Sequence, residues 1–247
     1  MYIKCLGSGD AFGSGGRFNT SFYLRTKSTG ILLDCGGSTL IALKREGLSS
    51  DDIDVILITH LHGDHFGGLA FILCEILALG KRKKTLTIVG PEETKKRTLQ
   101  SLECFYPGVE FTESAPIRFL HYKAGETKDL GDFQLTPYPA KHSPTTNPHS
   151  LRIETDDRVI AYSGDTEWTE DLLKVSAGSD LFICEASGYR TPMKNHLTVA
   201  KIMEEQQRFR TKRIVLTHPG DEVLKHLDEI KLRVVEDGEI LMNEGAH

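Results

Sequence analysis

The feature that most constrains this sequence is a histidine cluster, His60-Leu-His62-Gly-Asp64-His65, directly after the apolar run 55–59. β-Branched residues in that run predict a buried strand that ends where the cluster begins. Gly63 allows a tight turn, and the apolar run after Gly67-Gly68 is interpreted as a helix. The cluster is therefore predicted to lie in a loop between a strand and a helix, where functional residues usually emerge.

Four side chains of this cluster are suited to binding metal. His60 and His62 are two residues apart, so an extended stretch can point both rings to one side. Asp64 and His65 follow the turn and can point to a second centre nearby. Imidazole and carboxylate together suit Zn²⁺, Mn²⁺ or Fe²⁺. The alternative is a polar loop that only makes hydrogen bonds, and it is disfavoured because burying four such groups without a partner would be costly.

The chain as a whole is typical of one enzyme domain. Its 247 residues contain no linker, repeat or sharp change in composition, which predicts a single domain over 1–247. The net charge of −5 gives no general attraction to nucleic acid or to acidic membranes. The longest apolar run, 69–79, is too short to span a bilayer. No signal peptide is visible and five scattered cysteines fit reduced thiols, so we expect a cytoplasmic protein without a membrane partner.

Short apolar runs bounded by Gly, Asp or Asn predict many strands, with helices between some of them. The expected strands are residues 2–6, 22–25, 31–34, 55–59, 85–89, 117–122, 133–138, 150–154, 159–162, 181–184 and 213–217. The expected helices, besides the apolar run 69–79, are 38–46, 91–105, 198–209 and 222–230. Because the strands come in runs, we expect an α/β (α+β) chain with largely antiparallel or mixed sheets.

The histidine cluster matches the HxHxDH signature of the metallo-β-lactamase superfamily, so the chain resembles that superfamily. The resemblance implies a four-layer αββα sandwich with a one- or two-metal site at one edge. It also requires three further ligands, each at the end of a strand. His142, Asp165 and His218 each follow a predicted strand, in the expected order. The resemblance therefore covers nearly the whole chain.

The implied metal site holds two divalent ions, with zinc preferred and manganese or iron as alternatives. The resemblance implies that His60, His62 and His142 would hold one ion. Asp64, His65 and His218 would hold the other, and Asp165 would bridge the two. Two metals about 3.5–4 Å apart share an activated water, and a metal-bound hydroxide would attack the substrate.

Among the branches of the superfamily, the chain most resembles ribonuclease Z and small phosphodiesterases. Four segments carry this likeness: a glycine-rich start with an RNxTS-like stretch, a DCG segment, a HEAT-like segment and an HST-like segment. They are found here at residues 6–21, 34–36, 184–187 and 195–198.

The same resemblance implies roles for individual residues. Glu185 would orient His196, and His196 would protonate the leaving oxygen or bind the phosphoryl oxygens, with Asp64 as a further catalytic residue. A general acid is needed by an alkoxide leaving group but not by a phenolate. The alternative for His196 is a solvent-facing residue before a helix. Asp34 is expected to make structural hydrogen bonds, and three residues are predicted to bind substrate: Asn19, Ser21 and Ser143.

One departure from ribonuclease Z bears on the substrate. That family carries a long arm that grips tRNA, inserted between the third histidine and the bridging aspartate. Here only 22 residues separate His142 from Asp165, and they are predicted to form one hairpin with a turn at Asp156-Asp157. The basic run 81–84 is interpreted as a solvated loop. We therefore expect a dinuclear metal-dependent phosphodiesterase acting on a small or cyclic phosphodiester or a short RNA.

Three alternatives stay open at this point. The same site could serve a lactonase or thioesterase, for which Glu185 and His196 would be dispensable. It could also serve a tRNA 3′ endonuclease of the ribonuclease Z type that binds tRNA without the usual arm. A metal-binding protein that has lost catalysis is disfavoured by the intact set of seven ligands. Whether the chain forms a homodimer is also left open by the sequence.

Overall fold

Most strands are buried on both faces, so alternate residues face two different cores. In the computed structural model, which describes residues 1–243, Ile31 and Leu33 of β3 (Gly30–Leu33) pack between two sheets. Leu32, between them, packs against helices instead. The same alternation sends Ile183 of β11 (Leu181–Glu185) inward and Phe182 outward. This explains why the strands appear in the sequence as continuous apolar runs.

The strands form two seven-stranded mixed sheets. The first has the order β14 (Ile240–Met242), β1 (Tyr2–Gly7), β2 (Ser21–Arg25), β3, β4 (Val55–Leu57), β5 (Leu86–Gly90) and β6 (Ile117–His121). The second has the order β13 (Arg233–Val234), β12 (Ile214–Thr217), β11, β10 (Val159–Tyr162), β9 (His149–Glu154), β8 (Gln134–Pro139) and β7 (Lys128–Asp129). Each sheet has an antiparallel part and a parallel part. The parallel part runs from β3 to β6 in the first sheet and from β10 to β13 in the second.

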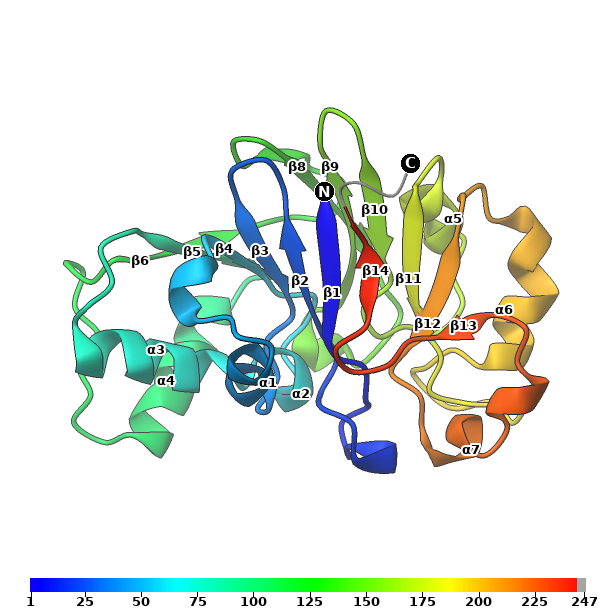
Figure 1. Cartoon of the computed structure of the whole chain (residues 1–247), viewed down its shortest axis with the longest axis horizontal. Helices are drawn as coiled ribbons and strands as arrows, with labels where there is room; N and C mark the ends of the chain where they lie inside the picture. Colours follow the sequence, from blue (N-terminus) through cyan, green and yellow to red (C-terminus); the bar gives the residue numbers. More distant parts are fainter. Residues whose placement is uncertain (244–247) are drawn as a thin grey trace.

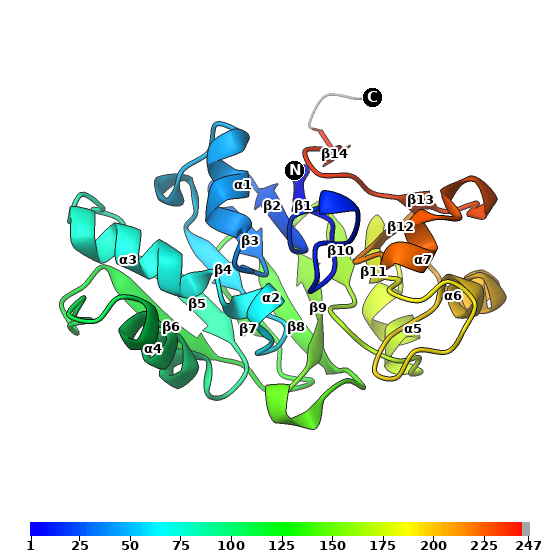
Figure 2. The same ribbon diagram turned by 90° about the horizontal axis from the view of Figure 1, so that it is seen from below.

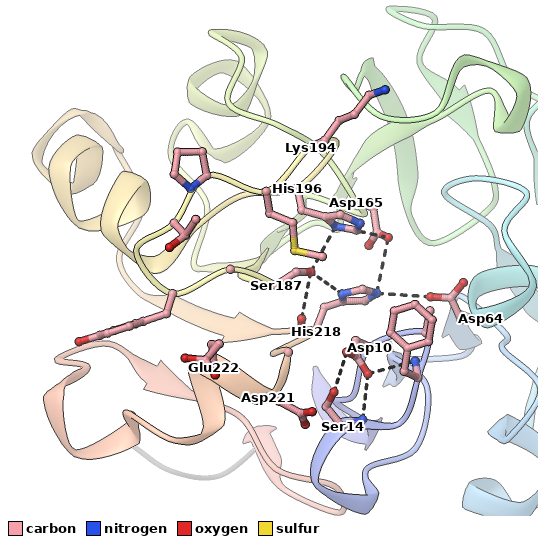
Figure 3. A pocket seen from close by; sticks show the side chains of 18 of the residues that line it. Asp10, Ser14, Asp64, Asp165, Ser187, Lys194, His196, His218, Asp221 and Glu222 are labelled. Atoms are coloured by element: carbon pink, nitrogen blue, oxygen red, sulfur yellow. Dashed lines mark hydrogen bonds and ion pairs between the residues drawn. The ribbon is translucent and has the colours of Figure 1, made fainter.

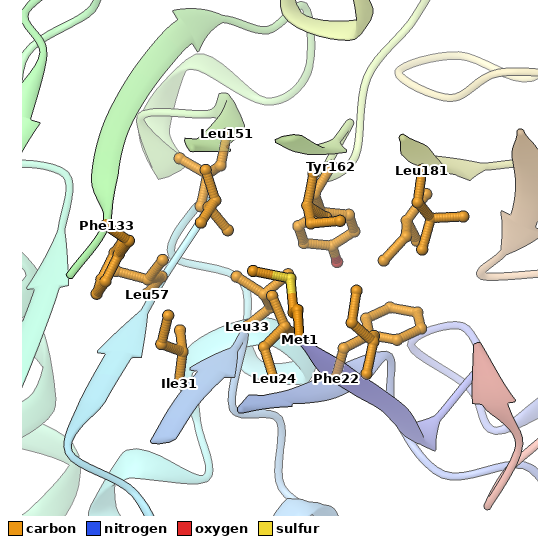
Figure 4. Packing of buried hydrophobic residues seen from close by; sticks show 14 of the residues in the cluster. Met1, Phe22, Leu24, Ile31, Leu33, Leu57, Phe133, Leu151, Tyr162 and Leu181 are labelled. Atoms are coloured by element: carbon orange, nitrogen blue, oxygen red, sulfur yellow. The ribbon is translucent and has the colours of Figure 1, made fainter. Parts of the chain in front are cut away.

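Helices cover the outer face of each sheet (Figures 1 and 2). The first sheet carries α1 (Thr39–Arg45), α2 (Gly63–Phe66), α3 (Leu69–Leu79) and α4 (Thr94–Phe105). The second carries α5 (Asp171–Ser176), α6 (Val199–Glu205) and α7 (Asp221–Leu224). The inner core between the sheets is apolar (Figure 4). The four layers confirm the predicted αββα sandwich. Within the described residues, no helix combines the length and apolarity needed to cross a membrane.

The end of the described chain is tied back to its beginning. β14 pairs antiparallel with β1 at the edge of the first sheet. The carboxylate of Asp237 accepts hydrogen bonds from the backbone N–H groups of Ser8 and Phe18, both at 2.8 Å. The backbone N–H of His218 also donates to the carbonyl of Ser8, at 2.8 Å. The segment after β1 is therefore held by residues more than two hundred positions away.

Several predicted boundaries were wrong. α4 begins at Thr94 rather than at 91, because Glu93 has a left-handed backbone (φ 74°) that no helix can contain. The helix predicted over 222–230 breaks after Leu224, and only a 3₁₀ turn follows at Leu227–Glu229. The helix predicted over 198–209 ends at Glu205 and continues as a 3₁₀ turn. The short strands β7, β13 and β14 were missed, since two or three residues carry no detectable alternation.

The basic run 81–84 lies between α3 and β5, as expected for a loop, but it is not wholly solvated. Lys81, Lys83 and Lys84 are exposed. Arg82 is buried, and its guanidinium donates to the backbone carbonyls of Ser50, Ile53 and Lys84. The Arg82 guanidinium therefore joins neighbouring loops and is not available to bind a ligand.

Candidate metal centre

Four strands from the two sheets bring the predicted ligands together. His60 follows β4, His142 follows β8, Asp165 follows β10 and His218 follows β12. β8, β10 and β12 run in the same direction, because β9 is antiparallel to both β8 and β10 while β10, β11 and β12 are parallel. Their carboxyl ends therefore meet at one edge of the sandwich, where the resemblance to the metallo-β-lactamase superfamily predicts the site.

Left-handed backbone helps to place two of these residues. His218 has a φ of 60°, and Gly164, directly before Asp165, has a φ of 54°. A Cβ atom on Gly164 would lie 3.0 Å from the carbonyl oxygen of His149 and 3.0 Å from the Cβ atom of Thr59. Glycine is therefore favoured before Asp165 by its conformation and by the close approach of two other loops.

Three histidine rings converge in the first group of candidate ligands. Nδ1 of His62 lies 3.2 Å from Nε2 of His60 and 2.9 Å from Nε2 of His142. A neutral imidazole nitrogen has a single lone pair, so Nδ1 of His62 cannot accept a full hydrogen bond from both neighbours. Oδ2 of Asp165 lies 3.8 Å from Nε2 of both His60 and His142, which completes the group.

The second group contains two carboxylates and two histidines. Oδ2 of Asp64 lies 3.2 Å from Nε2 of His65 and 3.3 Å from Nε2 of His218. Asp165 also contacts both histidines, with Oδ1 at 3.3 Å from His65 and Oδ2 at 3.5 Å from His218. Asp165 thus lies between the two groups, in the position predicted for a bridging ligand.

The residues of both groups fit divalent metal ions. Nε2 of His65 and Oδ1 of Asp165 are buried and have no hydrogen-bond partner among the described residues. Buried polar atoms are almost always satisfied, so unpartnered atoms that converge on one point call for a ligand. In each group, the candidate ligand atoms lie within 4.8 Å of one another. Imidazole and carboxylate donors at this spacing are the set that Zn²⁺, Mn²⁺ or Fe²⁺ accepts.

Hydrogen bonds behind the histidines decide which nitrogen faces the centre. Nδ1 of His65 lies 2.7 Å from Oδ2 of Asp34. Nδ1 of His142 donates to the carbonyl of Asn195 at 2.7 Å. Nδ1 of His218 lies 2.8 Å from Oγ of Ser187. Partners of this kind fix the ring and leave Nε2 free for metal.

Asp34 supports the centre from beneath, as predicted. Besides His65, it accepts hydrogen bonds from the hydroxyl of Tyr162 at 2.8 Å and the backbone N–H of Thr59 at 2.8 Å. Asp34 is fully buried. It joins the two sheets below the ligands and takes no place among them.

The two groups of ligands favour opposite charge states of their histidines. Burial, followed by the charge of neighbouring imidazoles, lowers the pKa of His60 and His62. Burial opposes the charged form of His65 and His218 as well, but the nearby carboxylates, Asp165 first, outweigh it. They raise the pKa of His65 well above its ordinary value and that of His218 to about 9. His60 and His62 are therefore kept neutral, which is the form that binds metal.

A hydrogen-bond network links the predicted catalytic pair to the ligands, and Figure 3 shows the part of it that joins His196, Ser187 and His218. Oε1 of Glu185 lies 3.0 Å from Nδ1 of His196, as the resemblance predicted. The hydroxyl of Ser187 lies 3.1 Å from Oε2 of Glu185 and 2.8 Å from Nδ1 of His218. Burial opposes a charge on His196, but the hydrogen bond and charge of Glu185 raise the pKa of this histidine. His196 is thus oriented next to the centre rather than turned to solvent.

A cavity of about 800 Å³ opens over this centre. Its inner end is formed by His62, Asp64, Asp165, His196 and His218. Its outer part lies between two loops, residues 10–14 and 188–194, and the first turn of α7. The reactive end and an adjoining outer space are therefore parts of one pocket.

The predicted substrate-binding residues lie elsewhere. Ser21 is fully buried and its hydroxyl donates to the carbonyl of Asp34 at 2.9 Å. The Asn19 amide donates to the carbonyl of Asp10 at 3.2 Å, and its backbone N–H donates to the Ser38 hydroxyl. The structure therefore gives Ser21 and Asn19 structural hydrogen bonds in place of the predicted substrate contact. Ser143 follows His142 outside the residues that line the pocket, and its role stays a prediction.

Sequence reasoning missed three residues of the site. Ser187 belongs to the HEAT-like segment, but only Glu185 in that segment was given a role. Asp10 and Phe12 lie in the glycine-rich start, and both line the pocket. The glycines around them were the available signal, since they indicate a loop with unusual backbone.

Comparison with known proteins decides the family. The sequence profile described as "Anti-Pycsar protein Apyc1" matches residues 1–241. The chain belongs to this family. Apyc1-family membership thus extends over both sheets and every candidate ligand.

Curated relatives of this Apyc1-family chain include ribonuclease Z sequences. Ribonuclease Z of Mycobacterium bovis is 27% identical over 193 residues, covering 74% of this chain and 69% of that protein. Ribonuclease Z of Lachnoclostridium phytofermentans is 25% identical over 270 residues, with 87% and 86% covered.

Solved structures show the same fold. The metallo-β-lactamase fold protein YhfI from Bacillus subtilis superposes with a TM-score of 0.80 at 17% identity, covering 98% of this chain and 99% of that one. The short form of human tRNase Z gives 0.77 at 24% identity, also with 98% and 99% covered. A diphosphatase of the PhnP family gives 0.77 at 18% identity, with 98% of each chain covered. The chain is therefore a hydrolase of the metallo-β-lactamase fold that is related to ribonuclease Z.

Proposed function

We propose that this hydrolase is a dinuclear metal-dependent phosphodiesterase that acts on a small or cyclic phosphodiester. The observation that carries the proposal is the position of His196. Its ring is oriented by Glu185, lines the same pocket as the candidate ligands and lies 4.9 Å, centroid to centroid, from the ring of His142. A proton donor held there serves a poor leaving group, such as the sugar oxygen of a phosphodiester.

The seven residues assigned from the sequence would hold two ions, with zinc preferred. When bound, the ions would supply Lewis-acid charge and lower the pKa of a bound water. The chain itself supplies the rest. Glu185 accepts from His196 at Nδ1, so Nε2 is the atom that would carry a proton toward the leaving oxygen. Because Glu185 raises the pKa of His196, the ring holds that proton at neutral pH more readily than a free histidine does.

The short connection between His142 and Asp165 favours a small substrate. It contains only a 3₁₀ turn (Pro144–Thr146) and the hairpin of β9 and β10. No arm projects from it within the described residues. The outer pocket is lined by the acidic residues Asp10, Asp221 and Glu222 and by the basic residues Arg190 and Lys194. Because the rim carries charges of both signs, a small substrate is favoured by the missing arm alone.

The related proteins support phosphate ester chemistry in general. One neighbour is described as a diphosphatase of the PhnP family and another as a tRNase Z. The ribonuclease Z relatives favour tRNA 3′ processing as the second candidate function. The missing arm favours the small substrate over this alternative.

The first experiment is hydrolysis of bis(p-nitrophenyl) phosphate by protein reloaded with Zn²⁺ or Mn²⁺, with His62→Ala as the blank. We expect turnover that the blank lacks. Nucleoside 3′,5′-cyclic monophosphates and an unprocessed tRNA are then compared under the same conditions. We expect cleavage of the cyclic nucleotides and none of the tRNA.

Other outcomes would redirect the assignment. Cleavage of the tRNA without cleavage of the cyclic substrates would establish the ribonuclease Z alternative. No phosphodiester turnover by protein shown to bind two ions would contradict the proposal and favour lactones or thioesters.

A further inference from the structure

Asn195, the residue directly before His196, has an unusual backbone. Its φ is 70°, in the left-handed region that asparagine adopts more readily than most residues with a side chain. Both of its backbone polar groups contact segments that carry candidate ligands. The carbonyl accepts from Nδ1 of His142 at 2.7 Å, and the N–H donates to Oε1 of Glu167 at 2.9 Å. The backbone that enters His196 is therefore placed by His142 and Glu167.

Glu167 is itself fixed on the segment that follows Asp165. Its backbone N–H donates to the carbonyl of Lys141 at 2.7 Å, and its Oε2 lies 2.6 Å from Nζ of Lys141. The hydroxyl of Thr166 accepts from the backbone N–H of Lys141 at 3.0 Å. The segment before His142 therefore fixes both the backbone and the carboxylate of Glu167.

The residue before Glu167 places the other partner of His196. The backbone N–H of Thr166 donates to Oε1 of Glu185 at 2.8 Å, and the same oxygen lies 3.0 Å from Nδ1 of His196. Two consecutive residues thus act on His196 indirectly, one through the ring and the other through the backbone. A proton donor needs both to be fixed, because a misplacement of about 1 Å can cost a hundredfold in rate.

The loop that leads into His196 depends on such contacts, because its tip is not buried. Residues 191–194 are all exposed, and Lys194 points away from the centre (Figure 3). Exposed backbone of this kind opens locally at a low cost in free energy. The hydrogen bond from Asn195 to the Glu167 carboxylate is charge-assisted and therefore one of the stronger kind. Its loss should let the loop, and His196 with it, leave the centre more often.

We propose that Glu167 is a positioning residue for His196, because it holds Asn195 beside His142 and so keeps the proton donor next to the candidate metal centre. The role of His196 as a general acid rests on the proposed function. The proposal adds a residue that is outside the ligand set and outside the catalytic pair, and on which proton donation depends.

Limited digestion with trypsin tests the contact between Glu167 and the loop without any turnover. Trypsin cuts after lysine, and Lys194 is exposed directly before Asn195. In metal-loaded protein, we expect Glu167→Ala to speed cleavage after Lys194 about tenfold, since the loop loses a charge-assisted hydrogen bond. Cleavage after the exposed Lys83 and Lys84, between α3 and β5, is the internal standard and should keep its rate. Mass spectrometry of the fragments gives both rates.

Kinetics tests whether this contact serves proton donation. At saturating metal, we expect Glu167→Ala to lower kcat about tenfold on esters with alkyl leaving groups, and less than about twofold on p-nitrophenyl esters. KM should not change for either class. Glu167→Gln keeps an oxygen that accepts from Asn195, so it should retain the wild-type cleavage rate and at least about a third of the wild-type kcat. The ion pair with Lys141 that it loses is partly exposed and contributes little.

Glu170 offers a matched control three positions along the chain. It is an exposed acid that pairs with Arg208, so Glu170→Ala should leave cleavage after Lys194 and every kcat unchanged. Three outcomes would overturn the proposal: Glu167→Ala is cleaved after Lys194 at the wild-type rate, its kcat falls equally on both classes of ester, or Glu167→Gln behaves like Glu167→Ala.

The two experiments separate this inference from the proposed function. If wild type hydrolyses no phosphodiester, the proposed function fails. Faster cleavage of Glu167→Ala after Lys194 would then still support the contact that positions His196, and an unchanged rate would overturn it.

Discussion

At the metal-centre end of the sandwich, Asp165 is buried among four histidines and one of its oxygens has no hydrogen-bond partner. At the opposite end, Asp132 in the turn between β7 and β8 is satisfied by the turn between β2 and β3. Its carboxylate accepts from the hydroxyls of Thr26 at 2.5 Å, Ser28 at 2.8 Å and Thr29 at 2.6 Å. Both aspartates join the two sheets, but of the two only Asp132 has hydrogen bonds to both of its carboxylate oxygens.

The contrast indicates that the two ends of the sandwich have different roles, one in stability and the other in activity. The Asp132 clasp, defined as Asp132 with Thr26, Ser28 and Thr29, holds the sheets together with ordinary hydrogen bonds. The metal-centre end gathers charged and unpartnered atoms, which bound cations would stabilise. Substitutions at the metal-centre end should therefore alter catalysis, and substitutions at the Asp132 clasp should alter the free energy of unfolding.

The largest effect is expected for His62→Ala. His62 is half-buried, so its removal leaves no large void. We expect hydrolysis to fall about a thousandfold or more, since a catalytic ion contributes several kcal/mol. The free energy of unfolding of metal-free protein should stay within about 1 kcal/mol of wild type. Turnover, metal content and urea unfolding measure the three quantities, and an unchanged metal content would contradict the assignment.

The second prediction concerns the catalytic pair. His196→Ala should slow hydrolysis of esters with alkyl leaving groups about a hundredfold, and p-nitrophenyl esters much less. A phenolate leaves without a proton, so only the alkyl substrates need His196. Rates on a series of leaving groups measure this difference. Equal loss across the series would eliminate the general-acid role.

The third prediction tests the clasp. Asp132→Ala should lower the free energy of unfolding by about 1–3 kcal/mol, because three hydroxyl donors lose a charged acceptor. Turnover and metal content should match wild type. Urea unfolding of metal-loaded protein is the measurement. A loss of activity without a loss of stability would break the separation of the two ends.

A smaller effect is expected for Ser187→Ala, which removes the hydroxyl behind His218. Partners of this kind typically change metal affinity about tenfold or more. We expect about a tenfold weaker second ion, measured by titration with a competing chelator. Ser14→Ala is the matched control, since Ser14 lines the same pocket without contacting a ligand histidine. Equal affinities in both variants would exclude a supporting role for Ser187.

The smallest expected effect is a pH dependence of the stability that the Asp132 clasp contributes. Burial opposes the charge of Asp132, but hydrogen bonds from Thr26, Thr29 and Ser28 outweigh it and lower the pKa to about 2. The unfolded value is about 3.9, so the stability from this group is complete above that pH and is lost as pH falls toward 2. The difference in unfolding free energy between wild type and Asp132→Ala should therefore shrink below pH 4. A constant difference from pH 5 to 2.5 would show that the carboxylate charge contributes nothing.

The sequence predicted which residues converge because each candidate ligand lies beside a strand that is visible as an apolar run. His142, Asp165 and His218 each follow such a run, and the structure brings them to the histidine cluster. The sequence could not show contacts between residues that are distant along the chain and meet only in the folded structure. The hydroxyl of Ser187 lies between Glu185 and His218 only because two separate segments of the chain meet there.

Local rules also failed at two positions outside the site. Proline and two glutamates at positions 91–93 predict a helix start, yet Glu93 is left-handed and α4 begins one residue later. Arg82 looked like part of a solvated run, but carbonyl groups of another loop bury it. For Arg82, the partners that decide its burial lie about thirty positions away in the sequence.

The ties between β14, Asp237 and the start of the chain have a consequence for synthesis on the ribosome. β1 and the loop that carries Phe12 are synthesised before their partners His218, Asp237 and β14. The second group of candidate ligands also lacks His218 until then. A nascent chain therefore completes neither its first sheet nor this group of candidate ligands until these partners have left the ribosome.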